Sequence, residues 1–148
     1  MRDPLLELPG YVLQRAANAA SADLNKRLSS IGLRQADFAF LKLIDAEPGM
    51  IQSDAGRVLE IKSANMVAFA SRHEQSGLLN REPADGRSLA LTLTIKGRKT
   101  LGMANQIVTE FENDLIERVP ERLRPMVVPI LIALWDSPDT AQKTDESA

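Results

Sequence analysis

Side chains that can read the edges of DNA bases follow one another from position 63 to 72 at the spacing of one helix face. An Asn such as Asn65 can bond adenine with both polar atoms of its amide, whereas Val67 and Ala68 can only make apolar contact, best with a thymine methyl. The predicted outward set is Ser63, Ala64, Asn65, Val67, Ala68, Ser71 and Arg72. Met66, Phe69, Ala70, His73 and Gly77 are expected to pack inward. The alternative is that Ser63 is only a residue at the helix start and that Asn65 is merely solvated.

Phosphate contacts are expected from Ser53, Arg57 and Lys62, which would position this helix without specifying a base sequence. The pattern predicts a short helix, a turn, and a second helix over about 62–76 that ends at Ser76-Gly77. A helix held in this way can enter the major groove.

Two short strands are predicted to follow, over 79–83 and 88–93, joined by Ala84-Asp85-Gly86. The second strand alternates apolar and polar residues with a period of two. A hairpin beside the helix can reach the phosphates or the minor groove. Taken alone, Asp85 is explained as a plain turn-forming residue.

The chain lacks the residues that most catalytic and metal-binding sites require. The sequence has no Cys and only one His, His73, so it offers neither a thiol sensor nor the ligands of a typical zinc site. It also shows no Gly-rich phosphate loop and no motif around a nucleophile. We therefore expect no catalytic residue, no cofactor and no metal, and hence no enzyme.

The charge of the chain is unevenly distributed. The net charge is −2, but residues 51–99 carry eight Lys or Arg against five Asp or Glu, a local charge of +3 that leaves −5 on the rest. This asymmetry favours DNA docking on residues 51–99, although a charge of +3 also fits an ordinary solvated surface.

The flanking segments read as helices. An amphipathic stretch over 11–30 is stopped by Gly32, and a second helix over 34–47, with Phe38, Leu41, Leu43 and Ile44 inward, ends at Pro48-Gly49. Thr94 is expected to cap a long helix that continues to about Glu117, which suits a dimer interface. A kinked or late-starting helix is expected over 126–135 because of Pro120, Pro125 and Pro129, followed by a flexible tail over 137–148.

The 148 residues and their 44% hydrophobic content fit one intracellular domain. No apolar run is long enough for a membrane span, and the first residues lack the features of a secretory signal. The expected location is the cytoplasm.

Several short motifs, in order, resemble the MarR family of winged-helix transcription regulators. They are Gly32-Leu33, Phe38-Ala39-Phe40-Leu41, Pro48-Gly49, Gly77-Leu78-Leu79, Asp85-Gly86-Arg87 and Leu93-Thr94 with Gly97. The resemblance implies a mainly α fold with a small β-hairpin wing. It also implies a winged helix-turn-helix lobe over 34–94 and a helical dimerisation region over 1–33 and 95–136.

The resemblance also implies roles. The family's wing motif is Asp-x-Arg, here Asp85 and Arg87, with the Arg entering the minor groove and the Asp orienting basic side chains through a charge-assisted hydrogen bond. Many members carry a second Arg where this chain has Gly86, and often an Arg where it has Ala68. The Gly at position 86 predicts a weaker electrostatic contact between the wing and DNA, and the Ala at position 68 predicts fewer direct contacts to bases.

Effectors of the family are commonly aromatic carboxylates or phenols, and sometimes aromatic acyl-CoA thioesters. Arg15 is the expected carboxylate partner, with ring contacts and a hydrogen bond from Tyr11, Asn18 and Phe38. Alternatively, Phe38 is a core residue and Arg15 forms a surface or intersubunit ion pair. A buried His73 must have a hydrogen-bond partner in the core or line an effector cavity, and the remaining alternative is that it is exposed at the surface. The phosphates of a thioester would need further cations, such as Arg34 or the pair Lys26 and Arg27.

These observations predict a homodimeric, ligand-responsive regulator, a repressor by preference, that binds a pseudo-palindromic operator and is released by a small aromatic acid or its CoA thioester. The alternative is a dimeric small-molecule-binding protein whose DNA-binding face has weakened.

Overall fold

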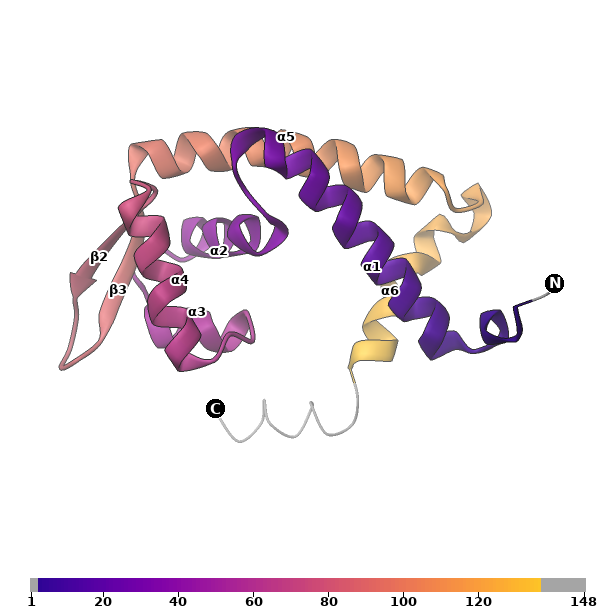
Figure 1. Cartoon of the computed structure of the whole chain (residues 1–148), viewed down its shortest axis with the longest axis horizontal. Helices are drawn as coiled ribbons and strands as arrows, with labels where there is room; N and C mark the ends of the chain where they lie inside the picture. Colours follow the sequence, from indigo (N-terminus) through magenta and orange to yellow (C-terminus); the bar gives the residue numbers. More distant parts are fainter. Residues whose placement is uncertain (1–2, 137–148) are drawn as a thin grey trace. The chain divides into compact units, whose positions relative to one another are not determined.

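The computed structural model describes residues 3–136 and consists mainly of helices with one small sheet (Figure 1). It divides into two compact units, Met1–Thr109 and Glu110–Ala148. The elements of the described residues are η1 (Pro4–Glu7), α1 (Pro9–Leu28), η2 (Ser29–Ile31), α2 (Gln35–Ala46), β1 (Met50–Ile51), α3 (Gln52–Val58), α4 (Ser63–Gln75), β2 (Leu79–Pro83), β3 (Leu89–Leu93), α5 (Ile95–Glu117), η3 (Glu121–Leu123) and α6 (Arg124–Trp135), where η marks a 3-10 helix. The predicted fold class is confirmed.

Helix α1 begins two residues earlier than the sequence predicts and ends at Leu28. Pro9 occupies its first turn, where a missing N–H costs nothing, so Pro9-Gly10 belongs to the helix rather than preceding it. The chain then makes the 3-10 turn η2, and Gly32 ends it in the left-handed conformation at φ 72°. The predicted stop at Gly32 is therefore confirmed.

Helix α2 buries Asp37, Phe40, Leu41 and Ile44, which recur at intervals of three and four residues along one face. Of the predicted inward set, Leu41 and Ile44 are buried, and Phe38 and Leu43 are half-buried. The first residue of this buried face is Asp37, which is charged. A pattern of apolar residues therefore does not reveal that its position is buried.

Helices α3 and α4 form the expected helix-turn-helix. The turn between them contains Glu60 in the left-handed region at φ 56°, and the N–H of Ile61 donates to the Gly56 carbonyl at 2.8 Å. On α4, Met66, Ala70 and His73 are buried, as predicted. Gly77, predicted to share that face, instead lies beyond the helix end and is exposed.

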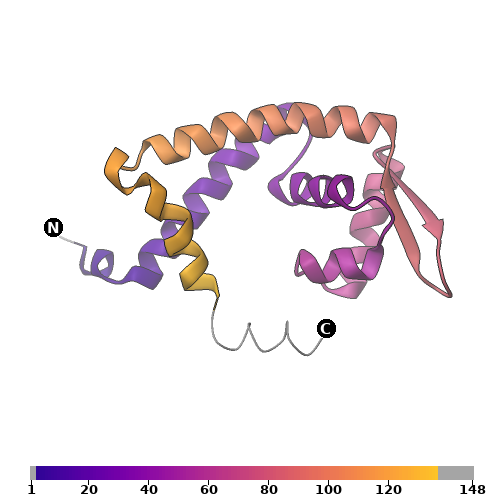
Figure 2. The same ribbon diagram turned by 180° about the vertical axis from the view of Figure 1, so that it is seen from behind.

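The wing is a hairpin of β2 and β3, and β3 also pairs with β1 to give the antiparallel order β1-β3-β2. The register places Leu79 opposite Leu93 and Pro83 opposite Leu89. Strand β2 has the predicted bounds, β3 starts one residue late, and the two-residue β1 was not predicted. Figure 2 shows the hairpin from behind, running beside α4 and extending beyond it.

The start of α5 is held against the wing by Thr94 and Gly97. The Thr94 hydroxyl accepts from the Gly97 N–H at 2.9 Å, as predicted for a cap, and donates to the Gly77 carbonyl at 2.6 Å. A Cβ at Gly97 would collide with the Leu78 carbonyl oxygen. The absence of a side chain therefore allows α5 to approach the first residues of β2.

In the second unit, η3 follows the end of α5 and leads into α6. Pro125 lies in the first turn of α6 and Pro129 inside it, which matches the expected late-starting helix. The predicted flexible tail over 137–148 lies outside the described residues. None of the helices described over 3–136 has the length and apolar character needed to cross a membrane.

Candidate nucleic-acid interface and neighbouring pockets

The outward face of α4 is free for contact. Ser63, Ala64, Asn65 and Ala68 are exposed, and Val67 is 55% exposed. Exposed apolar residues beside one polar Asn give a face that can accept a thymine methyl and an adenine edge. Ser71 is half-buried and lies at the margin of this face.

Four of the predicted contact residues line one shallow hollow of about 200 Å³ between α3 and α4, namely Ser53, Arg57, Ser63 and Val67. Lys62 is exposed as the N-cap residue of α4. The Arg57 guanidinium pairs with Asp54 on the same helix, but its side chain is 77% exposed. Because an exposed ion pair contributes little, Arg57 remains able to turn towards a phosphate.

The tip of the wing carries Asp85, Gly86 and Arg87, all of them exposed. It is closed by backbone bonds from Ala84 N–H to the Ser88 carbonyl at 2.9 Å and from Ser88 N–H to the Asp85 carbonyl at 3.3 Å. Gly86 takes φ 65°. No hydrogen bond or ion pair between Asp85 and Arg87 occurs among the described residues, so the orienting contact implied by the family motif is absent here.

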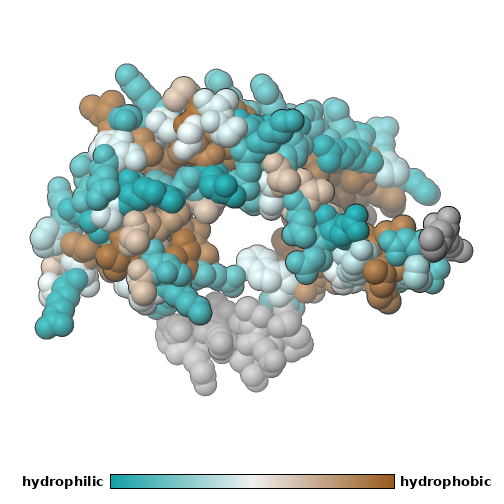
Figure 3. Space-filling view, in the orientation of Figure 1, coloured by the Kyte–Doolittle hydropathy of each residue, from teal (hydrophilic) through white to brown (hydrophobic). Residues whose placement is uncertain are grey.

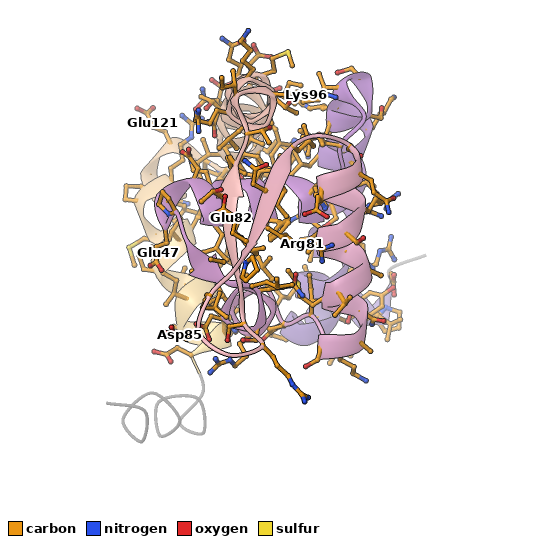
Figure 4. All side chains as sticks on the ribbon, turned by 90° about the vertical axis from the view of Figure 1, so that its left-hand side faces the viewer. Glu47, Arg81, Glu82, Asp85, Lys96 and Glu121 are labelled. Carbon is orange, nitrogen blue, oxygen red and sulfur yellow. The ribbon has the colours of Figure 1, made fainter. Side chains whose placement is uncertain are left out.

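The wing is fixed to α4 by Arg81, which sequence reasoning missed. Its guanidinium donates to both carboxylate oxygens of Glu74, at 3.3 and 3.0 Å, and to Gln52 Oε1 at 3.4 Å. The hydrogen bond from Arg81 is the main reason that the pKa of Glu74 lies below its usual value. Figure 4 shows Arg81 reaching from β2 towards α4, with Asp85 at the hairpin tip.

A second polar cluster joins α2 to the recognition helix. Asp37 is 6% exposed, and its Oδ1 lies 2.9 Å from both His73 Nε2 and Arg72 Nη2. Its Oδ2 accepts from the Arg34 N–H at 2.7 Å and thereby caps α2. Burial alone would raise the pKa of Asp37, but hydrogen bonds from His73 and the Arg34 backbone, with the charges of His73 and Arg72, outweigh it and lower the pKa.

His73 is a buried histidine, 3% exposed, with a partner for each ring nitrogen. Nδ1 lies 2.7 Å from the Phe69 carbonyl oxygen, and Nε2 faces the Asp37 carboxylate. Both partners offer oxygen atoms that can accept a hydrogen bond. The rings of Phe40 and Phe69 pack around it, with centroids 5.0 and 4.6 Å away. His73 therefore has the core partner that the sequence called for.

The four residues predicted to bind an aromatic carboxylate lie on α1 and α2. The Arg15 guanidinium donates to the Tyr11 hydroxyl at 2.8 Å, and both residues belong to α1. Arg15 and Asn18 are exposed, while Phe38 on α2 is half-buried. None of these four residues lines either of the two larger hollows described next.

Described residues of the first unit line two further hollows that are larger than the one between α3 and α4. One, of about 410 Å³, is lined by the charged residues Arg34, Asp37, Arg72, His73 and Lys96. The other, of about 460 Å³, is lined by Ser21, Asn25, Arg34, Gln35 and a set of four apolar residues, Ala36, Ala39, Leu59 and Ile61. His73 lines the first of them, and Arg34, named above as a further cation for a thioester, lines both. Within residues 3–136 no group of His, Asp and Glu side chains could hold a metal ion.

Known proteins similar to this chain are transcriptional repressors. The structure of the repressor CouR bound to a 23-mer DNA duplex superposes with a TM-score of 0.84, is 35% identical, and covers 90% of this chain and 97% of that chain. CouR bound to p-coumaroyl-CoA gives a TM-score of 0.83 at 32% identity, with 93% and 98% covered.

A more distant relative is the HTH-type transcriptional repressor Rv2887 of Mycobacterium tuberculosis, 26% identical over 112 residues, which are 74% of this chain and 81% of the relative. Its structure in complex with salicylic acid, described as a MarR family protein, has a TM-score of 0.67 and covers 85% of this chain and 95% of that chain. No protein-family model matches the chain. With the helix-turn-helix, the wing and these relatives together, the chain belongs to the MarR family of winged helix-turn-helix transcription regulators.

Proposed function

We propose that this protein is a homodimeric repressor that binds a pseudo-palindromic operator and releases it when a small aromatic acid or its CoA thioester binds. The observation that carries the proposal is the exposed outward face of α4, presented beside the exposed tip of the wing. A helix in this position can lie in the major groove while Arg87 reaches the adjacent minor groove. CouR bound to DNA and to p-coumaroyl-CoA, and Rv2887 bound to salicylic acid, support a ligand-responsive repressor.

Homodimerisation is supported by apolar side chains that each unit leaves exposed. Those nearest the start of the first unit are Leu5, Leu6, Leu8, Val12 and Leu13, and Figure 3 shows hydrophobic surface around η1. In the second unit they are Met126, Val128, Ile130, Leu131, Ile132, Leu134 and Trp135 on α6. Exposed apolar surface of this kind marks interaction sites, and a second copy of the chain would bury it.

Release follows from a difference in affinity. The two recognition helices of a dimer must fit successive major grooves, about 34 Å apart. A ligand that binds more tightly to a dimer in which this fit is lost shifts the equilibrium away from DNA.

The alternative function is a dimeric small-molecule-binding protein with a weakened DNA-binding face. Ala68 and Gly86 favour it, because neither supplies a cation. Arg72 and Arg81 also form ion pairs within the chain, with Asp37 and Glu74 respectively, instead of leaving their charges unpaired for DNA. Fluorescence anisotropy with labelled upstream DNA of the gene distinguishes the two functions, because only the repressor binds that DNA more tightly than an unrelated duplex.

Arg87→Ala is expected to weaken operator binding by about 1 to 3 kcal/mol, because it removes a groove contact without disturbing the core. The dimer should remain intact in sedimentation, since Arg87 is exposed at the hairpin tip. Lys99→Ala, an exposed cation on α5, is the matched control and should bind as the parent does. An unchanged affinity for Arg87→Ala would show that the wing role is wrong.

Arg57→Ala is expected to flatten the dependence of log K on log salt by about two units, because each of two copies loses one phosphate contact. The measurement is anisotropy at several salt concentrations. Lys42→Ala is the control, because Lys42 on α2 donates to Asn105 of α5. Equal slopes for Arg57→Ala and the parent would remove Arg57 from the interface.

A further inference from the structure

The N-terminal part of the recognition helix contains no charged residue. Helix α4 begins at Ser63, and the first cation within it is Arg72. The exposed neutral residues that precede this cation are Ser63, Ala64, Asn65, Val67 and Ala68. In a helix-turn-helix protein, the N-terminal residues of the recognition helix are the ones that contact base edges in the major groove. Base reading by this part of α4 therefore depends on apolar side chains, one hydroxyl and one amide.

Arg72 itself is held by the neighbouring helix α2. Its Nη2 lies 2.9 Å from Asp37 Oδ1, and its guanidinium carbon lies 5.2 Å from the centroid of the Phe69 ring. The Arg72 side chain is 62% exposed, but Asp37 is buried, and a buried carboxylate is destabilised when a cationic partner turns away. Arg72 also lies about 10 Å further along the helix axis than Asn65. Reaching a guanine would therefore break a contact that joins α4 to α2.

Two other cations lie near the start of α4. Lys62 is its N-cap residue, and Arg57 on α3 pairs with Asp54. Cations that contact phosphates fix the register of a recognition helix without specifying bases. Guanine is usually recognised by an Arg or Lys side chain that donates to both O6 and N7. Within residues 63–71, α4 has no side chain of this kind.

The exposed side of α4 carries an apolar stripe of Ala64, Val67 and Ala68, whose positions three and four apart share one helix face. Val67 is the largest of these side chains and is 55% exposed. The apolar group that a base edge offers in the major groove is the C5-methyl of thymine. Asn65 follows Ala64 in the sequence, and its amide matches N6 and N7 of adenine. Thymine and adenine together form an A·T pair.

We propose that α4 recognises A·T pairs in each half-site, with Val67 packed against a thymine methyl group and Asn65 bonded to an adenine edge, and that it reads no guanine. This inference rests on the proposed function and names the kind of half-site that this function requires. Val67 selects thymine over cytosine, because cytosine has no methyl group at C5. Asn65 selects adenine over guanine, because guanine presents an acceptor where adenine presents an amino donor.

The test uses the full chain and the operator fragment that footprinting identifies upstream of the gene. Fluorescence anisotropy compares this fragment with three copies that are changed throughout both half-sites, with deoxyuridine for thymidine, 7-deazaadenine for adenine, or 7-deazaguanine for guanine. All three changes alter the major-groove edge, where α4 docks, and leave the minor groove as it was.

Deoxyuridine should weaken binding by about fifteenfold or more, since each buried methyl group contributes about fourfold and each half-site supplies at least one. 7-Deazaadenine should weaken binding by about tenfold or more, because one hydrogen bond is lost in each half-site. 7-Deazaguanine should change the affinity by less than about twofold, because α4 makes no bidentate guanine contact.

Variants of two exposed residues assign these contacts to their side chains. Val67→Ala should bind the parent operator more weakly and reduce the effect of deoxyuridine to less than about fivefold, because the methyl group has lost most of its partner. Asn65→Ala should reduce the effect of 7-deazaadenine to less than about twofold. Ile95→Ala, at a 68% exposed apolar residue on α5, is the control and should respond to all four duplexes as the parent does. Circular dichroism establishes that each variant is folded.

A deoxyuridine effect of less than about twofold in the parent, or an effect of 7-deazaguanine as large as that of 7-deazaadenine, would overturn the inference. An unchanged deoxyuridine effect in Val67→Ala would also overturn it, because the methyl group would then act through the shape of the duplex. These outcomes leave the proposed function intact, since the parent still binds its operator. If the parent binds the fragment no more tightly than a scrambled duplex, the proposed function itself fails and the inference falls with it.

Discussion

Asp37→Ala is expected to lower the free energy of unfolding by about 3 to 5 kcal/mol, the usual cost of removing one partner from a buried ion pair. In this variant His73 Nε2 loses its acceptor, the Asp37 carboxylate, although His73 is only 3% exposed. It also removes the side chain that accepts from the Arg34 N–H and the partner of Arg72. Three contacts that join the start of α2 to α4 are lost together.

Urea denaturation followed by circular dichroism measures this change. Asp45→Ala is the matched control, because Asp45 is an exposed carboxylate on the same helix and should change the stability by less than about 0.5 kcal/mol. If Asp37→Ala were no more destabilising than Asp45→Ala, the cluster would not hold α2 to the recognition helix.

The contribution of Asp37 should also depend on pH. Its pKa is lowered in the folded protein, so its stabilising effect is complete above the ordinary value of 3.8 and is lost as the pH falls through the lower folded value. The difference in stability between the parent and Asp37→Asn should therefore shrink on acidification below about pH 4. A difference that stayed constant from pH 7 down to pH 2.5 would contradict the charged state assigned to Asp37.

Truncation of the chain before Met126 is expected to abolish the dimer and give monomers or aggregates. The deletion removes the exposed apolar residues of α6, among them Val128, Leu131 and Trp135. No other part of the second unit exposes so many large apolar side chains among the described residues. An interface without them would bury too little apolar surface to hold two copies together.

Sedimentation velocity measures the outcome. A chain that ends at Asp136 is the control, because it keeps every described residue of α6, and it should sediment as the full chain does. A soluble, intact dimer formed by the chain truncated before Met126 would refute this interface.

The recognition helix and the wing could be predicted because their signals are local. The apolar period of Met66, Ala70 and His73 gives the buried face of α4, and Gly77 and Asp85-Gly86 mark the turns on either side of β2. The cap at Thr94 also depends on residues only three positions apart. Patterns of this kind are visible in a single sequence.

The polar contacts that join distant elements could not be predicted. Asp37 and His73 are 36 positions apart, and an acidic residue at a helix start looks like an ordinary capping residue. Arg81 entered the sequence analysis only as one of the eight cations of residues 51–99, whereas in the structure it pairs with Glu74. Only the packing of α4 against α2 and β2 shows these pairs.

The effector site stays a prediction. Arg15 was chosen because it is a cation on the first helix, yet its side chain bonds Tyr11 one turn away, and neither residue lines the two larger hollows. Arg34 was considered only as an additional cation for phosphates. Its position in the lining of both larger hollows depends on how α1, α2 and α4 come together, which no local pattern records.

The central claim, that this chain is an operator-binding repressor, is tested most directly by footprinting the purified protein on the upstream region of its own gene. The account predicts protection of two half-sites whose centres lie one helical turn, or a multiple of it, apart, at protein concentrations that leave a scrambled duplex of equal length unprotected. Anisotropy on the protected fragment should show an affinity that falls steeply with salt. Equal binding to the scrambled duplex, or no protection at any concentration that keeps the protein soluble, would contradict the claim.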